Sequence, residues 1–234
     1  MKYTVVISVL FILGTTATLR QEIDHGSQGR TKVLKRIVKR SLNGLAAQML
    51  PLLETKIISN CNDSKSAEEL QDVYSEMKVC FAKEKILRVS KEDFWKNIKE
   101  CSKDAITKTR NCLPEDRKYF PEFVLSVAKS AVDFMYEDVD LIRVDLAACV
   151  PKLNNFEAQY DYLRCLRGIS SKDNSTSPTE LPSQAEFCAK FIPANQCFTD
   201  MIKGHCPQTS NLKKFRENYI NMAKRPCEES NEIS

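Results

Sequence analysis

The sequence lacks the motifs on which zinc sites, reactive dithiols and β-hairpins depend. It has two histidines, His25 and His205, and no two of its cysteines are separated by two residues. Structural zinc sites need about four Cys or His ligands at short spacings, and reactive dithiols use C-x-x-C, so neither kind of site is indicated. Glycine occurs six times, and no Asn-Gly or Asp-Gly turn joins two alternating hydrophobic runs. The scarcity of such turns argues against a β-hairpin fold.

Long hydrophobic runs are also missing, except at the N-terminus. Lys2 precedes an apolar run from Tyr3 to Leu13, and small residues follow up to Ala17. This is the pattern of a secretory signal peptide, which we assign to residues 1–17, and the run is about half the length that spans a bilayer. Residues 18–29 are expected to form a flexible N-terminal arm. We therefore expect a soluble protein that is secreted to the extracellular space.

The charge balance excludes one class of partner. Lys and Arg total 35 and Asp and Glu total 31, which gives a formal net charge of +4. So small an excess is not typical of nucleic-acid binding, and we expect no nucleic-acid partner.

Cysteine is abundant, and every cysteine follows the signal peptide. An even number of cysteines in an exported protein indicates disulfides, although the pairing does not follow from sequence. In a helix, residues 101 and 112, or 197 and 206, would be farther apart than a disulfide spans, so each would bond to another element. The ten expected disulfide cysteines are Cys61, Cys80, Cys101, Cys112, Cys149, Cys165, Cys188, Cys197, Cys206 and Cys227.

Export also gives meaning to the N-glycosylation motifs. Asn62-Asp63-Ser64 and Asn174-Ser175-Thr176 fit the acceptor pattern, so Asn62 and Asn174 are the candidate glycosylation sites. Asn195 fits only a rarer form that ends in cysteine, and it carries little weight.

Helical periodicity recurs through most of the mature chain. In residues 66–83, apolar side chains fall at i, i+3, i+4 and i+7, and similar patterns follow Ser90, Pro121 and the Thr209-Ser210 pair, which are suited to helix starts. We predict an all-α fold: a disulfide-stapled helical bundle at residues 30–228. An exposed loop rich in Ser, Thr and Pro is expected at 169–182, and a C-terminal tail at 229–234.

A weak internal repeat involves two cysteine-bounded segments. "CSKDAITKTRNC", residues 101–112, and "CFTDMIKGHC", residues 197–206, each place Asp at the fourth position and Ile two residues later. The chain is either built from two related four-cysteine helical units, or the similarity is a coincidence among helical segments.

The candidates for chemistry are sparse. His205 is the only histidine of the predicted domain, and the sequence contains no G-x-S-x-G motif that would place a nucleophilic serine for a catalytic triad. His205 is therefore best interpreted as a polar residue at a helix end. Asp138 and Asp140 lack the glycine and glutamate of a calcium-binding EF-hand, and a solvated acidic helix face is expected there. We predict no catalytic residue, no metal site and no cofactor, and therefore no enzyme.

The segment 30–56 is a basic amphipathic helix by pattern. Its apolar residues form one stripe, and the cationic residues Lys32, Lys35, Arg36 and Lys39 gather on another face. Such a helix packs on a protein core, or else its basic face contacts an anionic membrane or a partner.

The signal, the spaced cysteines, the helical periodicity and the stretch from Cys197 to Pro207, "CFTDMIKGHCP", together resemble the insect 27 kDa haemolymph glycoprotein family. That resemblance implies a secreted glycoprotein of extracellular fluid and supplies no catalytic residue. We expect a non-enzymatic binding or carrier protein whose partner is a small apolar ligand or another protein. The alternative is a defence or venom-type effector that acts on membranes through helix 30–56.

Overall fold

The computed structural model describes residues 54–61, 63–81, 83, 87, 89–170 and 181–228. Helices dominate these ranges, and no β-strand occurs in them. The all-α prediction is confirmed. None of the helices in these ranges has the length and apolar character needed to cross a membrane.

Seven α-helices are bounded in the described part of the chain. They are α3 (Ser64–Phe81), α4 (Lys91–Cys112), α5 (Phe120–Glu137), α6 (Ala147–Leu153), α7 (Phe156–Ser170), α8 (Gln184–His205) and α9 (Ser210–Glu228). Residues 54–59 are also helical, a 3-10 turn η2 (Glu115–Arg117) precedes α5, and a π-helical segment η3 (Leu141–Leu146) leads into α6. Because α7 continues through Ser170, the predicted loop at 169–182 starts two residues too early; residues 171–180 lie outside the described ranges.

Local sequence signals begin several helices. The Ser90 hydroxyl accepts a hydrogen bond from the Asp93 backbone N–H at 3.0 Å, and Thr209 caps α9 by accepting from the Leu212 N–H at 3.2 Å. Pro121 lies in the first turn of α5, where a missing N–H costs nothing. A reciprocal capping box opens α8, in which Ser183 and Glu186 each bond the other's backbone N–H.

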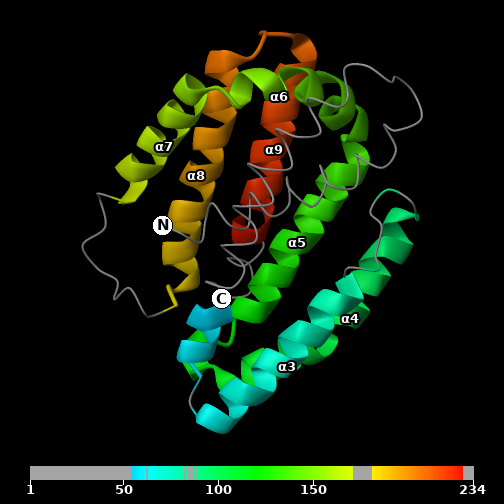
Figure 1. Cartoon of the computed structure of the whole chain (residues 1–234), viewed down its shortest axis with the longest axis vertical. Coiled ribbons are helices and arrows are strands. Elements are labelled where there is room, and N and C mark those ends of the chain that lie inside the picture. Colours follow the sequence, from blue (N-terminus) through cyan, green and yellow to red (C-terminus); the bar gives the residue numbers. More distant parts are fainter. Residues whose placement is uncertain are drawn as a thin grey trace.

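The helices pack side by side in the order α3, α4, α5, α9, α8 and α7 (Figure 1). The central pair therefore consists of α5 and α9, which are far apart in sequence, and α3 and α7 are the outer helices. The segment formed by η3 and α6 connects α5 to α7 and contacts α9 and α8.

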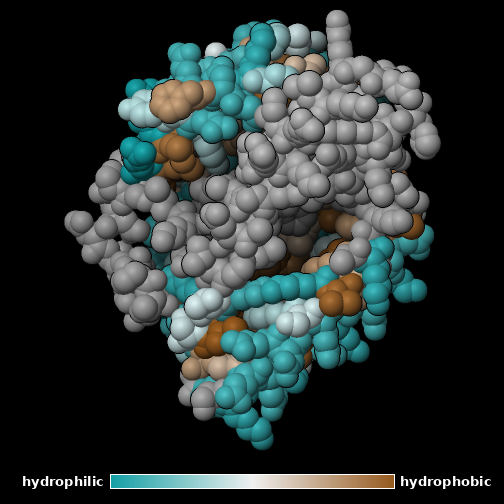
Figure 2. All heavy atoms as spheres, in the orientation of Figure 1, coloured by the Kyte–Doolittle hydropathy of each residue, from teal (hydrophilic) through white to brown (hydrophobic). Residues whose placement is uncertain are grey.

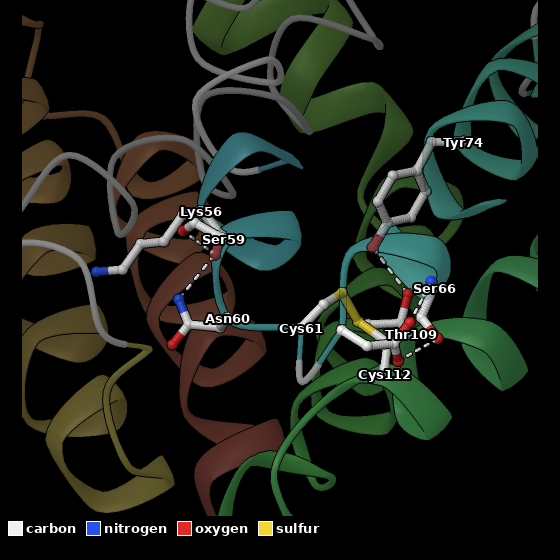
Figure 3. Close-up of a disulfide and its surroundings, with 9 residues drawn as sticks. Lys56, Ser59, Asn60, Cys61, Ser66, Tyr74, Thr109 and Cys112 are labelled. Atoms are coloured by element: carbon white, nitrogen blue, oxygen red, sulfur yellow. Dashed lines mark hydrogen bonds between the residues drawn. A yellow bond between two sulfur atoms is a disulfide. The ribbon is translucent and has the colours of Figure 1, made fainter. Parts of the chain in front are cut away.

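Five disulfides join all ten cysteines, so the disulfide prediction is confirmed. The pairs are Cys61–Cys112, Cys80–Cys101, Cys149–Cys206, Cys165–Cys197 and Cys188–Cys227. Cys101 does not bond Cys112, and Cys197 does not bond Cys206, as the helical spacing required. Figure 3 shows the Cys61–Cys112 disulfide, beside which the Tyr74 hydroxyl hydrogen-bonds to Thr109 Oγ1 at 2.8 Å.

The disulfides repeat one nested arrangement. In α3–α4, Cys80–Cys101 is enclosed in sequence by Cys61–Cys112; across α6–α8, Cys165–Cys197 is enclosed by Cys149–Cys206. A third helix follows each set, α5 in the first unit and α9 in the second. The weak sequence repeat thus occupies corresponding places, and this arrangement favours two related units over coincidence. The fifth disulfide, Cys188–Cys227, joins the start of α8 to the end of α9 within the second unit.

Two hydrophobic cores hold the two units together. One contains Leu70 of α3, Phe123 of α5 and Phe187 of α8; the Phe123 and Phe187 ring centroids are 5.0 Å apart. The other contains Phe134 of α5 and Tyr219 of α9, whose ring centroids are 5.7 Å apart. Each buried aromatic side chain contributes roughly 1.5–3 kcal/mol of transfer free energy. Because both cores take residues from both units, the units fold as one body.

Candidate functional site

The outer helix α7 exposes a row of large hydrophobic side chains. Phe156, Tyr160 and Leu163 are 86 %, 48 % and 49 % exposed. Their spacing of four and three residues places them on one face of the helix. The rings of Phe156 and Tyr160 stack with centroids 6.2 Å apart. Figure 2 shows two hydrophobic patches among hydrophilic atoms on the surface over α7. We call Phe156, Tyr160 and Leu163 the α7 stripe.

The opposite face of α7 is anchored. Ala158 and Leu166 are buried, and Tyr162 packs its ring against Phe198 of α8 with centroids 6.5 Å apart. Burial raises the pKa of Tyr162 to about 12. The Cys165–Cys197 disulfide ties the middle of α7 to α8, so the helix is held covalently while the α7 stripe faces solvent.

Cationic groups accompany the C-terminal half of the α7 stripe. The Arg164 guanidinium carbon lies 6.0 Å from the centroid of the Tyr160 ring, and one guanidinium nitrogen is 3.1 Å from an Asp161 carboxylate oxygen. Arg167, one turn further, is exposed and has no ion-pair partner among the described residues. The exposed face of α7 therefore combines an apolar row with a positive end.

His205 is a polar residue at a helix end, as the sequence indicated. It lies in the last turn of α8, where its Nε2 is 3.1 Å from a carboxylate oxygen of Asp161, and its side chain is 14 % exposed. Both cysteines of "CFTDMIKGHC" are in disulfides, and no group of three or more His, Cys, Asp or Glu in the described ranges is placed to hold a metal ion. The segment supplies two attachment points for neighbouring helices.

The expectation for Asp138 is wrong. Asp140 is exposed, but Asp138 is only 9 % exposed, and its Oδ1 accepts a hydrogen bond from Asn218 Nδ2 of α9 at 2.8 Å. Asp138 ends α5 at the point where α9 crosses it, so α9 covers a carboxylate that local sequence placed on a solvated face.

Three sets of predicted residues lie outside the described ranges. These are the glycosylation candidates Asn62 and Asn174, and the basic residues Lys32, Lys35, Arg36 and Lys39, together with the predicted signal, arm and tail. Asn195, the weak third motif, is described: it is fully buried, donates to the Phe191 carbonyl at 2.8 Å, and precedes the disulfide-bonded Cys197 by two residues. A folded chain cannot carry a glycan there. The membrane-effector alternative, which depends on helix 30–56, stays a prediction.

The α7 stripe itself was not predicted. Its signal is present in residues 156–169, where α7 has two apolar rows, one from Phe156 to Leu163 and one from Ala158 to Ile169. Sequence periodicity identifies both rows but does not say which one packs against α8.

A family model named domain of unknown function (DUF19) matches residues 96–228, which is more than half of the chain. The chain belongs to the DUF19 family. The match starts inside α4 and contains Cys101 and Cys112, whose partners Cys80 and Cys61 precede it. The folded body of this DUF19 protein therefore extends N-terminally beyond the matched region. No curated protein and no solved structure matches the chain, so the resemblance to insect haemolymph glycoproteins stays a prediction.

Proposed function

We propose that this DUF19 protein is a secreted, non-enzymatic binding protein of extracellular fluid whose α7 stripe contacts another protein. The five disulfides support the compartment, because disulfides persist in oxidising environments and are rare in the cytosol. The single observation that carries the proposal is the exposure of Phe156, Tyr160 and Leu163 on one face of a covalently held helix.

The energetic argument favours a protein over a small ligand at this face. Covering a side chain as exposed as Phe156 contributes roughly 1.5–3 kcal/mol, and aromatic residues are enriched among the residues that dominate interfaces. The stripe is a convex helix surface, whereas small ligands bind in concave sites. The disulfides limit the freedom that α7 loses on binding, which lowers the entropic cost of association.

The charged residues beside the α7 stripe indicate what kind of protein surface would fit it. Arg164 and Arg167 lie beside the apolar row at its C-terminal end. A complementary partner presents an apolar groove with acidic residues at one end, because opposite charges at an interface rim fix orientation and speed association. This geometry is that of an amphipathic helix docked in a groove.

The test compares wild type with a Phe156→Ser, Leu163→Ser double variant. A protein captured from extracellular fluid by the wild type is produced separately, and its affinity for both chains is measured by calorimetry. We expect the double variant to bind at least about tenfold more weakly, as loss of interface anchors does. The matched control is Val79→Ser on α3, because Val79 is 60 % exposed and lies outside the α7 stripe.

The substitutions of the double variant and of the control are all at exposed positions. The free energy of unfolding of each variant should therefore stay within about 0.5 kcal/mol of that of the wild type. Equal affinity of the stripe variant and wild type for the captured protein contradicts the proposal. So does an equal loss of affinity in Val79→Ser, which would place the contact elsewhere.

A further inference from the structure

A second site, concave where the α7 stripe is convex, lies where α9 crosses the end of α5. It is a groove of about 170 Å³ lined by Phe134, Glu137, Asp138, Lys214, Asn218, Asn221, Met222 and Arg225. We propose that this groove binds a small zwitterion of amino-acid type, with its ammonium group at Asp138 and its anionic group at the cationic rim on α9. The proposal does not depend on the function proposed for α7.

Asp138 is the residue that we expect to bind the ammonium group of the ligand. The residue is 9 % exposed, and Asn218 Nδ2 is its one hydrogen-bond donor among the described residues. An ionised carboxylate has about four acceptor positions, so most of its capacity faces the groove without a protein donor. No Lys, Arg or His nitrogen of the described residues lies within the 4.0 Å ion-pair limit of Asp138. An ammonium group bound in the groove would give this carboxylate a charge-assisted hydrogen bond, which is stronger than one between neutral groups.

The other acidic residue of the groove does not compete with Asp138 for a cation. Glu137, the other acidic residue of the groove, is 3.2 Å from Lys91 and is thus already paired. Asp138 is therefore the acidic residue of the groove that has no ion-pair partner among the described residues.

The opposite wall is positive. Lys214, Asn218, Asn221 and Arg225 follow one another on α9 at intervals of three or four residues, so they share a face. Lys214 and Arg225 are exposed and have no ion-pair partner among the described residues. The groove therefore offers a carboxylate and two cations, none of them in an ion pair among the described residues, to the same occupant, and this arrangement matches a zwitterion.

Size and lining set an upper limit on the ligand. Sites for drug-sized molecules occupy about 300–1,000 Å³, and a cavity of about 150 Å³ accommodates benzene. At about 170 Å³, the groove fits a single amino acid with a short apolar side chain, which Phe134 and Met222 would contact. This polar groove does not fit the apolar ligand expected from the sequence.

Three probes separate the contributions of the two charges: leucine, its decarboxylated analogue isoamylamine, and its deaminated analogue 4-methylpentanoate. Binding to the full chain is followed by NMR titration of the Asn218 and Asn221 side-chain amides, up to about 10 mM to cover the weak affinities of small ligands. We expect leucine to bind most tightly, isoamylamine more weakly, and 4-methylpentanoate at least about tenfold more weakly than leucine.

Variants test which residues bind the ammonium group and which bind the anionic group of the ligand. Asp138→Asn keeps the shape and should weaken leucine and isoamylamine by about tenfold or more, whereas Asp140→Asn, an exposed acidic control outside the groove, should change neither. Lys214→Gln with Arg225→Gln should weaken leucine but not isoamylamine. The proposal is overturned if leucine leaves the wild-type amide signals unmoved, or if 4-methylpentanoate binds as well as isoamylamine. The three probes decide this on the wild type, even if Asp138→Asn does not fold.

Discussion

The Tyr219 hydroxyl of α9 donates a hydrogen bond of 2.8 Å to Asn195 Oδ1 of α8, and neither residue is more than 1 % exposed. Asn195 in turn donates through Nδ2 to the Phe191 carbonyl at 2.8 Å. Tyr219 also packs its ring 5.1 Å from Phe198 and 5.7 Å from Phe134. One side chain thus joins the polar and aromatic contacts that hold α9 against α8 and α5.

Tyr219→Phe tests the polar part of this relationship. The ring remains, but Asn195 Oδ1 loses a donor in a site without water access, so we expect the free energy of unfolding to fall by about 1–3 kcal/mol. Urea unfolding measures this change in the free energy of unfolding, provided that the m-value is the same for both chains. Tyr160→Phe on the exposed face of α7 is the control and should stay within about 0.5 kcal/mol of wild type. A Tyr219→Phe variant as stable as wild type would mean that the hydrogen bond adds nothing to the packing.

Glu186→Gln tests the capping box of α8 through its pH dependence. The Ser183 backbone N–H and the Ser183 hydroxyl both donate hydrogen bonds to the Glu186 carboxylate. These bonds, the backbone bond most strongly, hold the pKa of that carboxyl below its ordinary value of 4.5. A pKa lowered by folding stabilises the protein above the unfolded pKa, and that contribution is lost as pH falls through the folded pKa. We expect wild type to exceed Glu186→Gln by a few tenths to about 1 kcal/mol at pH 7, because the ionised form makes the stronger cap.

The difference should shrink steadily as the pH falls below about 4.5, since Gln does not titrate. Chemical unfolding of both chains at several pH values gives the two curves. Parallel curves down to about pH 3 would show that the charge of Glu186 has no part in the cap.

Local patterns are sufficient to predict α3, α4, α5 and α9. The apolar spacing from Leu70 to Phe81 and the cap at Ser90 depend on residues within one or two turns, and both are present in α3 and α4. The same locality explains why residues 101 and 112 could be excluded as a disulfide pair. The capping box of α8 is equally local, because it consists of Ser183 followed three residues later by Glu186.

Contacts distant in sequence could not be predicted. Asn218 covers Asp138 from 80 residues away, and no pattern near Asp138 encodes this contact. The partners of Cys101 and Cys197 depend on which helices form hairpins, and this is set by tertiary packing. The exposure of Phe156 has the same origin, because α7 carries two apolar rows and α8 covers only one of them.

Removal of the inner disulfides tests the two-unit architecture. Cys80→Ala with Cys101→Ala opens a loop with a sequence separation of 21, and Cys165→Ala with Cys197→Ala opens one with a separation of 32. Each variant should lose about 2–4 kcal/mol. Hydrogen exchange followed by mass spectrometry should show faster exchange in α3 for the first variant and in α7 for the second, because each of these outer helices packs mainly against one other helix. Equal acceleration in both helices for either variant contradicts the unit boundary.

The order in which the disulfides are reduced should follow their access to solvent. Cys165 is exposed and Cys80 and Cys101 are partly exposed, whereas Cys149 and Cys206 are 1 % and 6 % exposed. Because an external thiolate must reach a sulfur to break the bond, we expect native-state reduction to open Cys165–Cys197 or Cys80–Cys101 first and Cys149–Cys206 last. Timed alkylation and peptide mapping identify the order. In denaturant the order should disappear, because burial no longer protects any sulfur. Early labelling of Cys149 in the native protein would contradict the packing around α6.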